Sequence, residues 1–356
     1  MQNADLNELL QVLRQWYLKG HRDLPWRNTK NPYHIWVSEI MLQQTRVEAV
    51  KPYYARFLQE LPTIADLAEA QEDVILKLWE GLGYYSRVRN MQTAAKQIME
   101  QHGGKMPADH KALLQLKGIG SYTAGAVASI AFDLPYAAVD GNVLRVMSRV
   151  FADNRDILLQ QTKKAWEMEI NAELTEEIAG DVNQALMELG ATVCVPNGAP
   201  KCEICPWRAY CVAYRQNTVL QYPVKSEKKP RTKEYLSVCF LTDGKKIALR
   251  KRGAKGLLAN LWELPNVQKE YALPMALTQW GISKADITHM KGQKHIFTHI
   301  EWYMDSYYIL VEQKEETPFV WVDLADMTEQ YALPSAFKKI WQEGIAKMEQ
   351  NKQTVI

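Results

Sequence analysis

The densest set of reactive side chains in the sequence is a group of four cysteines. Cys194, Cys202, Cys205 and Cys211 fall within eighteen residues, separated by seven, two and five others, and Pro206 follows the third. Four thiolates this close can surround one metal centre, either a tetrahedral zinc ion or a [4Fe–4S] cluster. The spacing alone does not choose between them. A disulfide framework is not expected, because the chain is large and no secretion signal is evident.

Two carboxylic acids lie in segments that predict opposite protonation states. Glu39 stands in a predicted helix, close to Trp36 and Leu42, and an apolar setting raises the pKa of a carboxyl so that it can act as a general acid near neutral pH. Asp140 stands where another helix should begin, and the helix dipole favours the ionised form of a capping carboxylate. An ionised carboxylate can stabilise a developing cation. The plainer alternatives are a structural helix glutamate and an ordinary N-cap.

The segment Leu116–Gly120 (LKGIG) predicts a tight turn between two helices. Gly118 ends the first helix, and the second begins near Tyr122. Such a turn exposes backbone N–H groups at a helix amino terminus, which suits a phosphate oxygen. The alternative is a helix–helix turn with a glycine cap and no ligand.

Helices must position these residues, because helical periodicity dominates the first 220 residues and no segment there has a convincing strand period. Asn31-Pro32 marks one helix start, since Asn can cap and Pro fits the first turn. Apolar residues at helical spacing also predict an amino-terminal helix around Leu6–Tyr17. The other predicted helices are Tyr33–Gln44, Thr63–Ala70, Asp73–Leu82, Arg89–His102, Ala108–Leu116, Tyr122–Phe132, Gly141–Phe151, Thr162–Leu174 and Ala179–Gly190.

After the cysteines the pattern changes to that of a second, α+β domain. Lys225–Lys233 holds five basic residues and a proline, as an exposed linker would. Asp243-Gly244 predicts a hairpin turn. The predicted strands are Tyr235–Leu241, Ile247–Leu249, Trp302–Val311 and Phe319–Val322, and the predicted closing helix is Ser335–Met348. We therefore expect a helical domain over 1–222, a linker over 223–234 and an α+β domain over 235–356.

Composition limits the class of protein further. The 356 residues are 47% hydrophobic, which excludes a mainly disordered chain. The net charge of +2 neither requires nor excludes a nucleic-acid partner. No apolar run is long enough for a membrane span, and the segment MQNADLNELL has no basic targeting region. We expect a soluble, intracellular protein.

Several motifs together resemble a known family. The LKGIG hairpin, Asp140 twenty residues after it and the four-cysteine loop resemble the endonuclease III superfamily of DNA glycosylases. Within it, WVSEIMLQQTRV, GLGYYSRVRN, GIGSYTAGAV and VDGNVLRV resemble the adenine DNA glycosylase (MutY) family, and the resemblance runs over the whole chain. It implies a multi-domain fold, in which an all-α helix-hairpin-helix glycosylase domain with an iron–sulfur loop is joined to an α+β Nudix-like carboxy-terminal domain.

The resemblance implies removal of adenine paired with 8-oxoguanine or guanine in double-stranded DNA, the first step of base excision repair. The adenine would be flipped out of the stack. The residue matching Glu39 protonates adenine N7, and the residue matching Asp140 stabilises the oxocarbenium-like sugar or bonds to it transiently. This is the two-carboxylate division of labour of glycoside hydrolysis. The expected protein is a monomer, without a membrane partner, in the cytoplasm at the nucleoid.

Further site residues carry over position by position. Tyr122 and Asn142 match residues beside the reacting sugar; Arg22, Trp26, Arg27 and Gln184 match the adenine pocket; Gln44 and Tyr84 match side chains that wedge into the duplex; and Gly118 and Gly120 form the DNA-binding hairpin. Bifunctional relatives place a nucleophilic Lys at position 122. Tyr122 therefore predicts a monofunctional glycosylase.

The resemblance also selects a [4Fe–4S] cluster over zinc, with Cys194, Cys202, Cys205 and Cys211 as ligands. The first interval, VPNGAPK, is one residue longer than is usual in the family, and it falls in a Pro/Gly loop that should absorb the insertion. The remaining cysteine, Cys239, is expected in the core of the second domain.

In the second domain, Lys251–Pro265 resembles the Nudix fold of 8-oxo-dGTP hydrolases, although the glutamate-rich catalytic box is absent after Pro265. We therefore expect recognition of 8-oxoguanine, with Phe297, Thr298 and His299 matching the loop that inspects the lesion. Thr298 replaces the family's usual Ser, which keeps the hydroxyl and adds a methyl group.

Three other functions compete with this interpretation. A bifunctional pyrimidine glycosylase is disfavoured by Tyr122 and by the second domain. A non-catalytic DNA-binding protein would leave the co-occurrence of Glu39 and Asp140 unexplained. A Nudix hydrolase would need the missing catalytic box.

Overall fold

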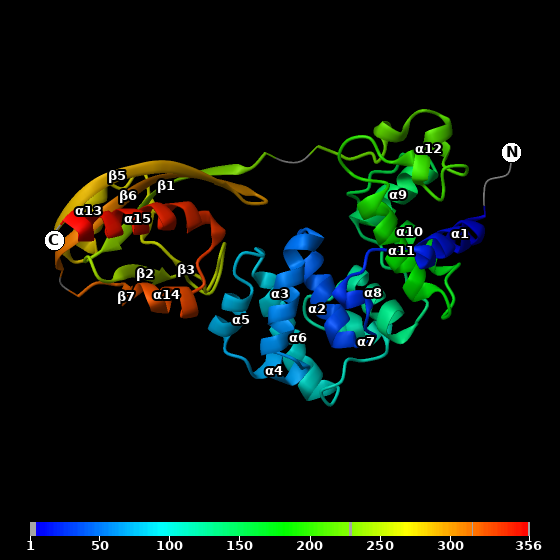
Figure 1. Ribbon diagram of the computed structural model, residues 1–356, viewed down its shortest axis with the longest axis horizontal. Coiled ribbons are helices and arrows are strands. Elements are labelled where there is room, and N and C mark those ends of the chain that lie inside the picture. The colour runs from blue at the N-terminus through cyan, green and yellow to red at the C-terminus, as the bar shows by residue number, and fades with distance from the viewer. Residues whose placement is uncertain (1–4, 228–229, 315, 355–356) are drawn as a thin grey trace. The chain divides into compact units, whose positions relative to one another are not determined.

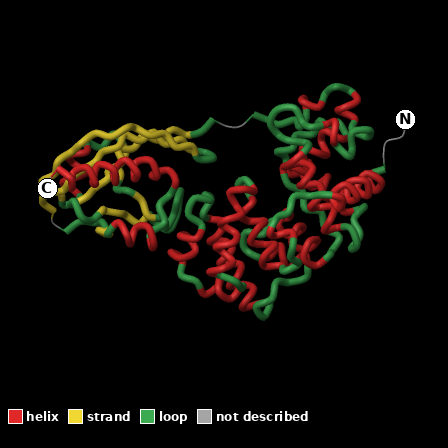
Figure 2. Tube along the Cα trace, in the orientation of Figure 1, coloured by secondary structure: helices red, strands yellow, loops and turns green. Residues whose placement is uncertain are grey.

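The computed structural model describes residues 5–227, 230–314 and 316–354 and divides them into two compact units. The first unit contains residues 1–69 and 90–227, and the second contains residues 70–89 and 228–356. Figures 1 and 2 show helices in the first unit and the strands in the second. The second unit thus includes a segment, 70–89, that precedes most of the helical residues in sequence. The predicted linker includes residues 228 and 229, which lie outside the described residues.

The first unit is helical, as predicted. Its helices are α1 (Leu6–Lys19), α2 (Pro32–Leu42), α3 (Val47–Glu60), α4 (Ile64–Glu69), most of α6 (Ser86–Gln101), α7 (His110–Gln115), α8 (Ser121–Phe132), α9 (Gly141–Val150), α10 (Gln160–Asn171), α11 (Ala179–Thr192) and α12 (Val212–Arg215), with short 3-10 turns η1 (Pro25–Arg27), η2 (Cys202–Ile204) and η3 (Val219–Gln221). The sequence analysis omitted α3, whose interior contains Pro52. A proline normally argues against a helix interior, and tertiary packing overrides that preference here.

The expected helix starts are confirmed at the two places that matter for the site. The Asn31 side chain accepts N–H bonds from Tyr33 and His34 at the start of α2, with Pro32 in the first turn. The Asp140 side chain caps α9 in the same way. Helix α8, rich in small and apolar residues, is almost entirely buried and packs against both α2 and α11. Capping and burial together therefore place the elements that carry Glu39, Tyr122 and Asp140 beside one another.

The predicted hairpin joins α7 to α8, and the first of its two glycines, Gly118, cannot be replaced without strain. Gly118 has φ +79°, and a Cβ added there would lie 2.7 Å from the Cβ of Asn90. The Lys117 N–H donates to Oε1 of Gln97, which ties the turn to α6. Gly120 has an ordinary φ of −93° and caps α8 without a side chain. The turn therefore leaves the first N–H groups of α8 without partners inside the helix.

The second unit is built on a mixed sheet. Its strands are β1 (Thr232–Thr242), β2 (Ile247–Lys251), β3 (Trp262–Glu263), β4 (Asn266–Gln268), β5 (Ile282–Ile296), β6 (Ile300–Lys314) and β7 (Val320–Val322), and its helices are α5 (Glu72–Leu78), α13 (Leu273–Gln279), α14 (Leu324–Gln330) and α15 (Lys338–Thr354), preceded by η4 (Ser335–Phe337). The strand order is β3-β2-β1-β6-β5, with β4 paired to β1 and β7 to β2. Strands β1 and β6 are parallel, and β5 and β6 form a long antiparallel hairpin.

The alternation predicted for β1 separates two cores. Leu236, Val238 and Phe240 pack into one cluster, together with residues of α15, and Cys239 and Leu241 pack into the other, together with residues of α13. The expectation that Cys239 is a core residue is confirmed, because it is fully buried. The sequence analysis missed β5, whose residues are mostly exposed and polar, so no alternation marks it.

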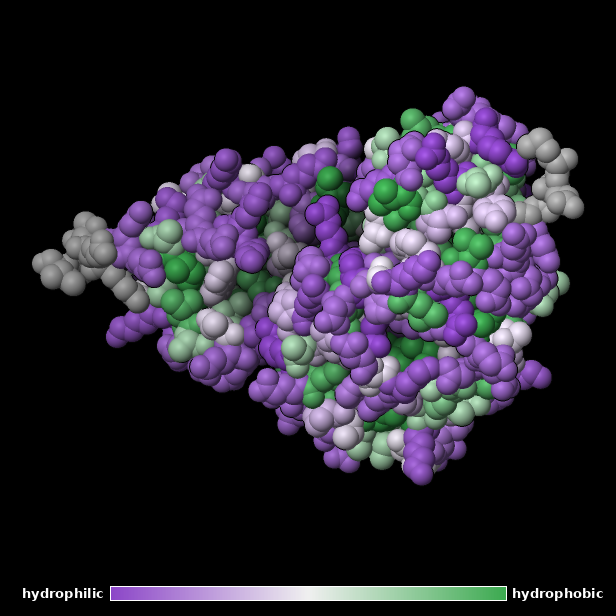
Figure 3. Space-filling view, turned by 45° about the vertical axis from the view of Figure 1, so that its right-hand side comes forward, coloured by the Kyte–Doolittle hydropathy of each residue, from purple (hydrophilic) through white to green (hydrophobic). Residues whose placement is uncertain are grey.

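Hydrophilic side chains predominate on the face of the molecule shown in Figure 3, and apolar residues there are scattered. Within the part of the chain that the structure describes, apolar side chains form buried clusters in both units. Among the described residues, no helix combines the length and the apolar character needed to cross a membrane.

Candidate functional site

The centre of the site is a short hydrogen bond between Tyr122 on α8 and Glu39 on α2. The Tyr122 hydroxyl donates to Oε2 of Glu39 at 2.5 Å and lies 3.1 Å from the sulfur of Met187 on α11. Glu39 is only 4% exposed, and burial raises its pKa to about 7, whereas the Tyr122 hydrogen bond lowers it and the charge of Asp140 raises it further. With a pKa of about 7, the carboxyl is protonated below that pH and partly ionised at neutral pH. Burial also raises the pKa of Tyr122 well above its ordinary value.

Asp140 and Asn142 form a second polar group at the start of α9. Asp140 accepts hydrogen bonds from the N–H groups of Asn142 and Val143, both at 2.8 Å, and from Nδ2 of Asn142 at 2.7 Å. The N-cap predicted from the sequence is thus present. Burial raises the pKa of Asp140, and these bonds and the charge of Arg145 oppose the rise. Burial therefore outweighs the helix-terminus effect that the sequence indicates.

Arg145 connects this group to the cysteine loop. Its Nη2 donates to Oδ1 of Asn142 at 2.9 Å and to the carbonyl of Gly190 at 2.8 Å, while its Nε donates to the carbonyl of Cys194 at 2.9 Å. Gly190 allows this approach, because a Cβ there would lie 2.7 Å from the Cβ of Asn142. Arg145 was not predicted as a site residue. It lies in an apolar stretch of α9, and the one signal in the sequence is that a buried arginine needs polar partners.

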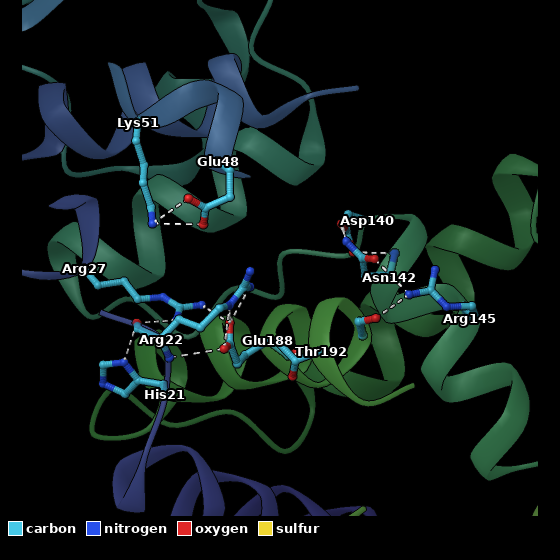
Figure 4. A network of polar contacts seen from close by, with 11 residues as sticks. His21, Arg22, Arg27, Glu48, Lys51, Asp140, Asn142, Arg145, Glu188 and Thr192 are labelled. Carbon is cyan, nitrogen blue, oxygen red and sulfur yellow. Dashed lines mark hydrogen bonds and ion pairs between the residues drawn. The ribbon is translucent and has the colours of Figure 1, made fainter. Parts of the chain in front are cut away.

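Two of the expected adenine-binding residues share a buried carboxylate. Arg22 and Arg27 both donate to Glu188 on α11, and each makes a bond of 2.7 Å to Oε2 (Figure 4). Burial alone would raise the pKa of Glu188, but the two guanidinium groups lower it to about 2. The sequence analysis missed Glu188, although it lies four positions after Gln184 and therefore on the same helix face.

The two other residues expected at the adenine pocket are placed by packing. Trp26 is buried in η1 and packs edge-on against Tyr54 of α3, with ring centroids 5.4 Å apart. Gln184 is half-buried on α11, and its amide donates to the carbonyl of Gly180 at 3.3 Å. These contacts neither require nor exclude a bound base.

The four clustered cysteines line one pocket. Cys194, Cys202, Cys205 and Cys211 share it with apolar side chains of α9 and α11 and with Arg149, whose Nη1 donates to the sulfur of Cys194 at 3.3 Å. All four are free thiols. Within residues 5–227, 230–314 and 316–354, no three His, Cys, Asp or Glu side chains are arranged to hold a metal ion. Four soft sulfur donors around one pocket, close to an arginine, nevertheless suit a thiolate-ligated group of several atoms.

The remaining predicted residues fall in both units. Gln44 has φ +60° at the turn after α2, in the first unit. Tyr84, which is 51% exposed and has φ +48°, is in the second unit, where its hydroxyl lies 3.0 Å from that of Thr298. Phe297, Thr298 and His299 form the tip of the β5–β6 hairpin. Phe297 packs edge-on against Trp302 at 4.9 Å, and the other two are exposed.

Two family models match the sequence. A model described as the HhH-GPD superfamily base excision DNA repair protein matches residues 37–174, and a NUDIX domain model matches residues 237–343. The first match spans Glu39, the hairpin and Asp140. The second spans most of the sheet of the second unit. The expected combination of a helix-hairpin-helix glycosylase domain with a Nudix-like domain is confirmed.

Adenine DNA glycosylases are similar to the chain over most of its length. That of Mus musculus is 36% identical, covering 87% of this chain and 72% of the relative, and that of Buchnera aphidicola subsp. Schizaphis graminum is 32% identical, covering 93% and 96%. A solved thermostable thymine-DNA glycosylase is similar with a TM-score of 0.54 and 29% identity, covering 59% of this chain and 96% of that one. An endonuclease III–DNA complex, with a TM-score of 0.52 and 21% identity, covers 61% and 98% and supports the fold.

Proposed function

Because the chain belongs to the adenine DNA glycosylase family, whose members act on DNA in base excision repair, we propose that it is a monofunctional enzyme for adenine paired with 8-oxoguanine or guanine. The observation that carries the proposal is the combination of a buried carboxyl at Glu39, whose pKa burial raises, with a carboxyl at Asp140 that accepts several hydrogen bonds. One acid and one base in neighbouring but different environments are what N-glycosidic bond hydrolysis requires.

Glu39 acts as the general acid. The Tyr122 hydroxyl hydrogen-bonds to Oε2 of Glu39 and so orients the carboxyl. Protonating adenine N7 makes the base a better leaving group and draws electrons from the N-glycosidic bond. Tyr122 therefore positions the Glu39 acid. The Tyr122 side chain has no amine that could form a Schiff base.

Asp140 stabilises the sugar as the bond breaks. Three hydrogen bonds from Asn142 and Val143 and the nearby charge of Arg145 stabilise the carboxylate form and oppose the rise in the pKa of Asp140 that burial causes. The ionised Asp140 attracts the oxocarbenium-like sugar or bonds to it until water completes the displacement.

The adenine-binding residues are Arg22, Trp26, Arg27 and Gln184. Gln44 and Tyr84 enter the duplex, and the N–H groups of the Gly118–Gly120 hairpin bind the DNA backbone. Phe297, Thr298 and His299 read the opposite base, and the hydrogen-bonding distance between the Tyr84 and Thr298 hydroxyls supports a shared role.

Cys194, Cys202, Cys205 and Cys211 hold a [4Fe–4S] cluster. The donor set and the shared pocket fit such a group, and apolar neighbours would shield it from water. When bound, the cluster supplies a rigid cross-link for the loop. The contacts of Arg145 and Arg149 with Cys194 tie that loop to α9.

The test is single-turnover release of adenine from a duplex with one A:8-oxoguanine pair, with thymine glycol and A:T duplexes alongside. We expect adenine loss, strand nicking only after alkali, and no action on thymine glycol. Glu39→Gln and Asp140→Asn should each lose 100-fold or more in rate, an estimate of about 10²–10⁴ for an acid–base group, and retain DNA affinity.

Adenine release that persists in both variants would remove the two carboxyls from their roles. Release of thymine glycol with nicking before alkali would instead favour a bifunctional pyrimidine glycosylase. Turnover of 8-oxo-dGTP with Mg²⁺, and none of DNA, would favour a Nudix hydrolase.

A further inference from the structure

One buried carboxylate near the site has no part in the proposed chemistry. Glu188 is 3% exposed, and both of its oxygens accept hydrogen bonds. Arg22 contributes its backbone N–H at 3.2 Å, Nε at 2.8 Å and Nη2 at 2.7 Å, and Arg27 contributes Nη2 at 2.7 Å. A carboxylate satisfied by two guanidinium groups stays ionised throughout the working pH range.

The two arginines belong to a segment with little regular structure of its own. Arg22 precedes the short η1 turn that carries Arg27, and Arg27 donates from Nη1 to the carbonyl of Arg22 at 3.0 Å. Glu188 is held rigidly on α11, directly after Met187, whose sulfur contacts Tyr122. The carboxylate therefore anchors both guanidinium groups to α11, the helix whose Met187 contacts Tyr122, as Figure 4 shows for the arginine side.

The charges in this cluster do not cancel. Two guanidinium groups and one carboxylate leave a net charge of one positive unit, and the Arg27 side chain is only 7% exposed, so water screens it weakly. The charge of Arg27 acts on Glu39 in the direction that releases its proton. Without Glu188, the positive charge of Arg27 would act in that direction without its carboxylate partner.

The other ionisable groups around Glu39 do not mask the effect of the arginine charge on the Glu39 proton. Tyr122 on α8 and Asp140 at the start of α9 face it. On α3, which also packs against α2, Glu48 and Lys51 pair with each other at 2.9 Å. Near the arginines, Tyr17 stays neutral because burial raises its pKa to about 12. His21, stacked on Tyr17, is exposed.

We propose that Glu188 is a positioning residue, which anchors Arg22 and Arg27 beside the adenine-binding site and neutralises enough of their charge for Glu39 to keep its proton near neutral pH. This inference rests on the proposed function, because it assigns the two arginines and Glu39 to adenine excision. It adds a residue that none of the matched motifs contains.

The experiment measures single-turnover excision from the A:8-oxoguanine duplex between pH 5.5 and 9 with saturating full-length enzyme. In Glu188→Gln the pH above which the rate falls should move down by about 0.5–1 unit. In Arg22→Gln it should move up, because one positive charge is removed. The double variant restores the wild-type net charge, and its profile should return toward that of the wild type.

The matched control is Asp181→Asn, two turns earlier on α11. Asp181 pairs with Nε of Arg14 at 2.8 Å, and both side chains are about a third exposed. Its profile should stay in place. A purely structural role for Glu188 would lower the rate equally at every pH and would give Arg22→Gln no upward shift, and either result would overturn the inference.

A readout without DNA separates this inference from the proposed function. Carboxyl ¹³C NMR follows the titration of Glu39, whose signal is identified by its absence from Glu39→Gln. The same opposite shifts should appear there. If they do and wild-type protein releases no adenine, the electrostatic role stands and the proposed substrate fails. If adenine is released and the titration does not move, the proposed function stands and the role of Glu188 fails.

Discussion

At the scale of single residues, the environment of Glu39 determines when it can act as an acid. Burial raises its pKa to about 7, so the carboxyl is protonated below that pH and ionised above it. The proposed mechanism uses the protonated form. Excision should therefore fall about tenfold per pH unit above pH 8. Single-turnover rates between pH 5.5 and 9 provide the test, with DNA binding measured in parallel, and a rate that rises steadily to pH 9 would exclude Glu39 as the acid.

Tyr122 determines the reaction type at the same scale. Its hydroxyl reaches Glu39 at 2.5 Å, so a lysine there would place an amine beside the proposed catalytic acid. We expect Tyr122→Lys to gain some strand cleavage, because an amine can attack the sugar carbon and form a Schiff base. Borohydride should trap a protein–DNA adduct with this variant. Tyr122→Phe is the control without an amine, and failure to trap any adduct with Tyr122→Lys would contradict the prediction.

At the scale of elements, the two glycines of the hairpin have different requirements. Gly118→Ala should lower the free energy of unfolding by about 1–2 kcal/mol, because φ is positive and the new Cβ would collide with Asn90. Gly120→Ala is the matched control, since its φ is ordinary and nothing lies within 4 Å of the new Cβ. Denaturant unfolding compares the two. Equal stability losses would show that the strain does not lie at Gly118.

Arg145 is the side chain that joins α9, α11 and the cysteine loop. Arg145→Met removes the Arg145 donor from the carbonyls of Gly190 and Cys194, leaves only Arg149 on the latter, and frees Oδ1 of Asn142, so we expect a stability loss of about 3 kcal/mol and a large loss of excision. Iron content per chain should also fall. Arg155→Met is the control, because Arg155 is 39% exposed and pairs with Asp153. Unchanged iron content together with unchanged excision in Arg145→Met would show that Arg145 does not couple the cysteine loop to Asn142 and Asp140.

At the scale of the whole molecule, residues 70–89 belong to the same compact unit as the Nudix-like sheet. Lys77 donates to the carbonyl of Tyr331 at 3.0 Å, Glu80 accepts from the N–H of Leu333 at 2.8 Å, and Lys251 pairs with Asp73 at 2.9 Å. The segment that carries the predicted wedge residue Tyr84 is therefore organised together with the predicted lesion-reading loop.

This organisation predicts that Thr298 affects discrimination between opposite bases more than it affects chemistry. Thr298→Val keeps the shape and removes the hydroxyl that lies 3.0 Å from that of Tyr84. Preference for A:8-oxoguanine over A:G should fall about 2- to 10-fold, the value of one hydrogen bond. The exposed Thr288 of β5 supplies the control, Thr288→Val. Equal losses with both duplexes would contradict a role in reading the opposite base.

Local patterns in the sequence were enough to predict the elements and the chemistry that depend on neighbouring residues. Helical periodicity, the Asn31 and Asp140 caps and the Gly118 turn are set by residues close in the chain, so most helices of the first unit and the apolar setting of Glu39 were predictable. The long motifs were sufficient to identify the family. Helix α3, with its internal proline, and strand β5, without alternation, were not predictable, because tertiary packing rather than local preference stabilises them.

The tertiary structure alone decided which distant side chains share charge and hydrogen bonds. Glu188 follows Arg22 by 166 positions, and Tyr122 follows Glu39 by 83, so no spacing rule connects either pair. Their pKa values depend on burial and on neighbours brought together by folding, as the upward shift at Asp140 illustrates. A sequence states which groups can ionise, whereas desolvation and proximity, which exist only in the folded chain, determine which of them hold a proton.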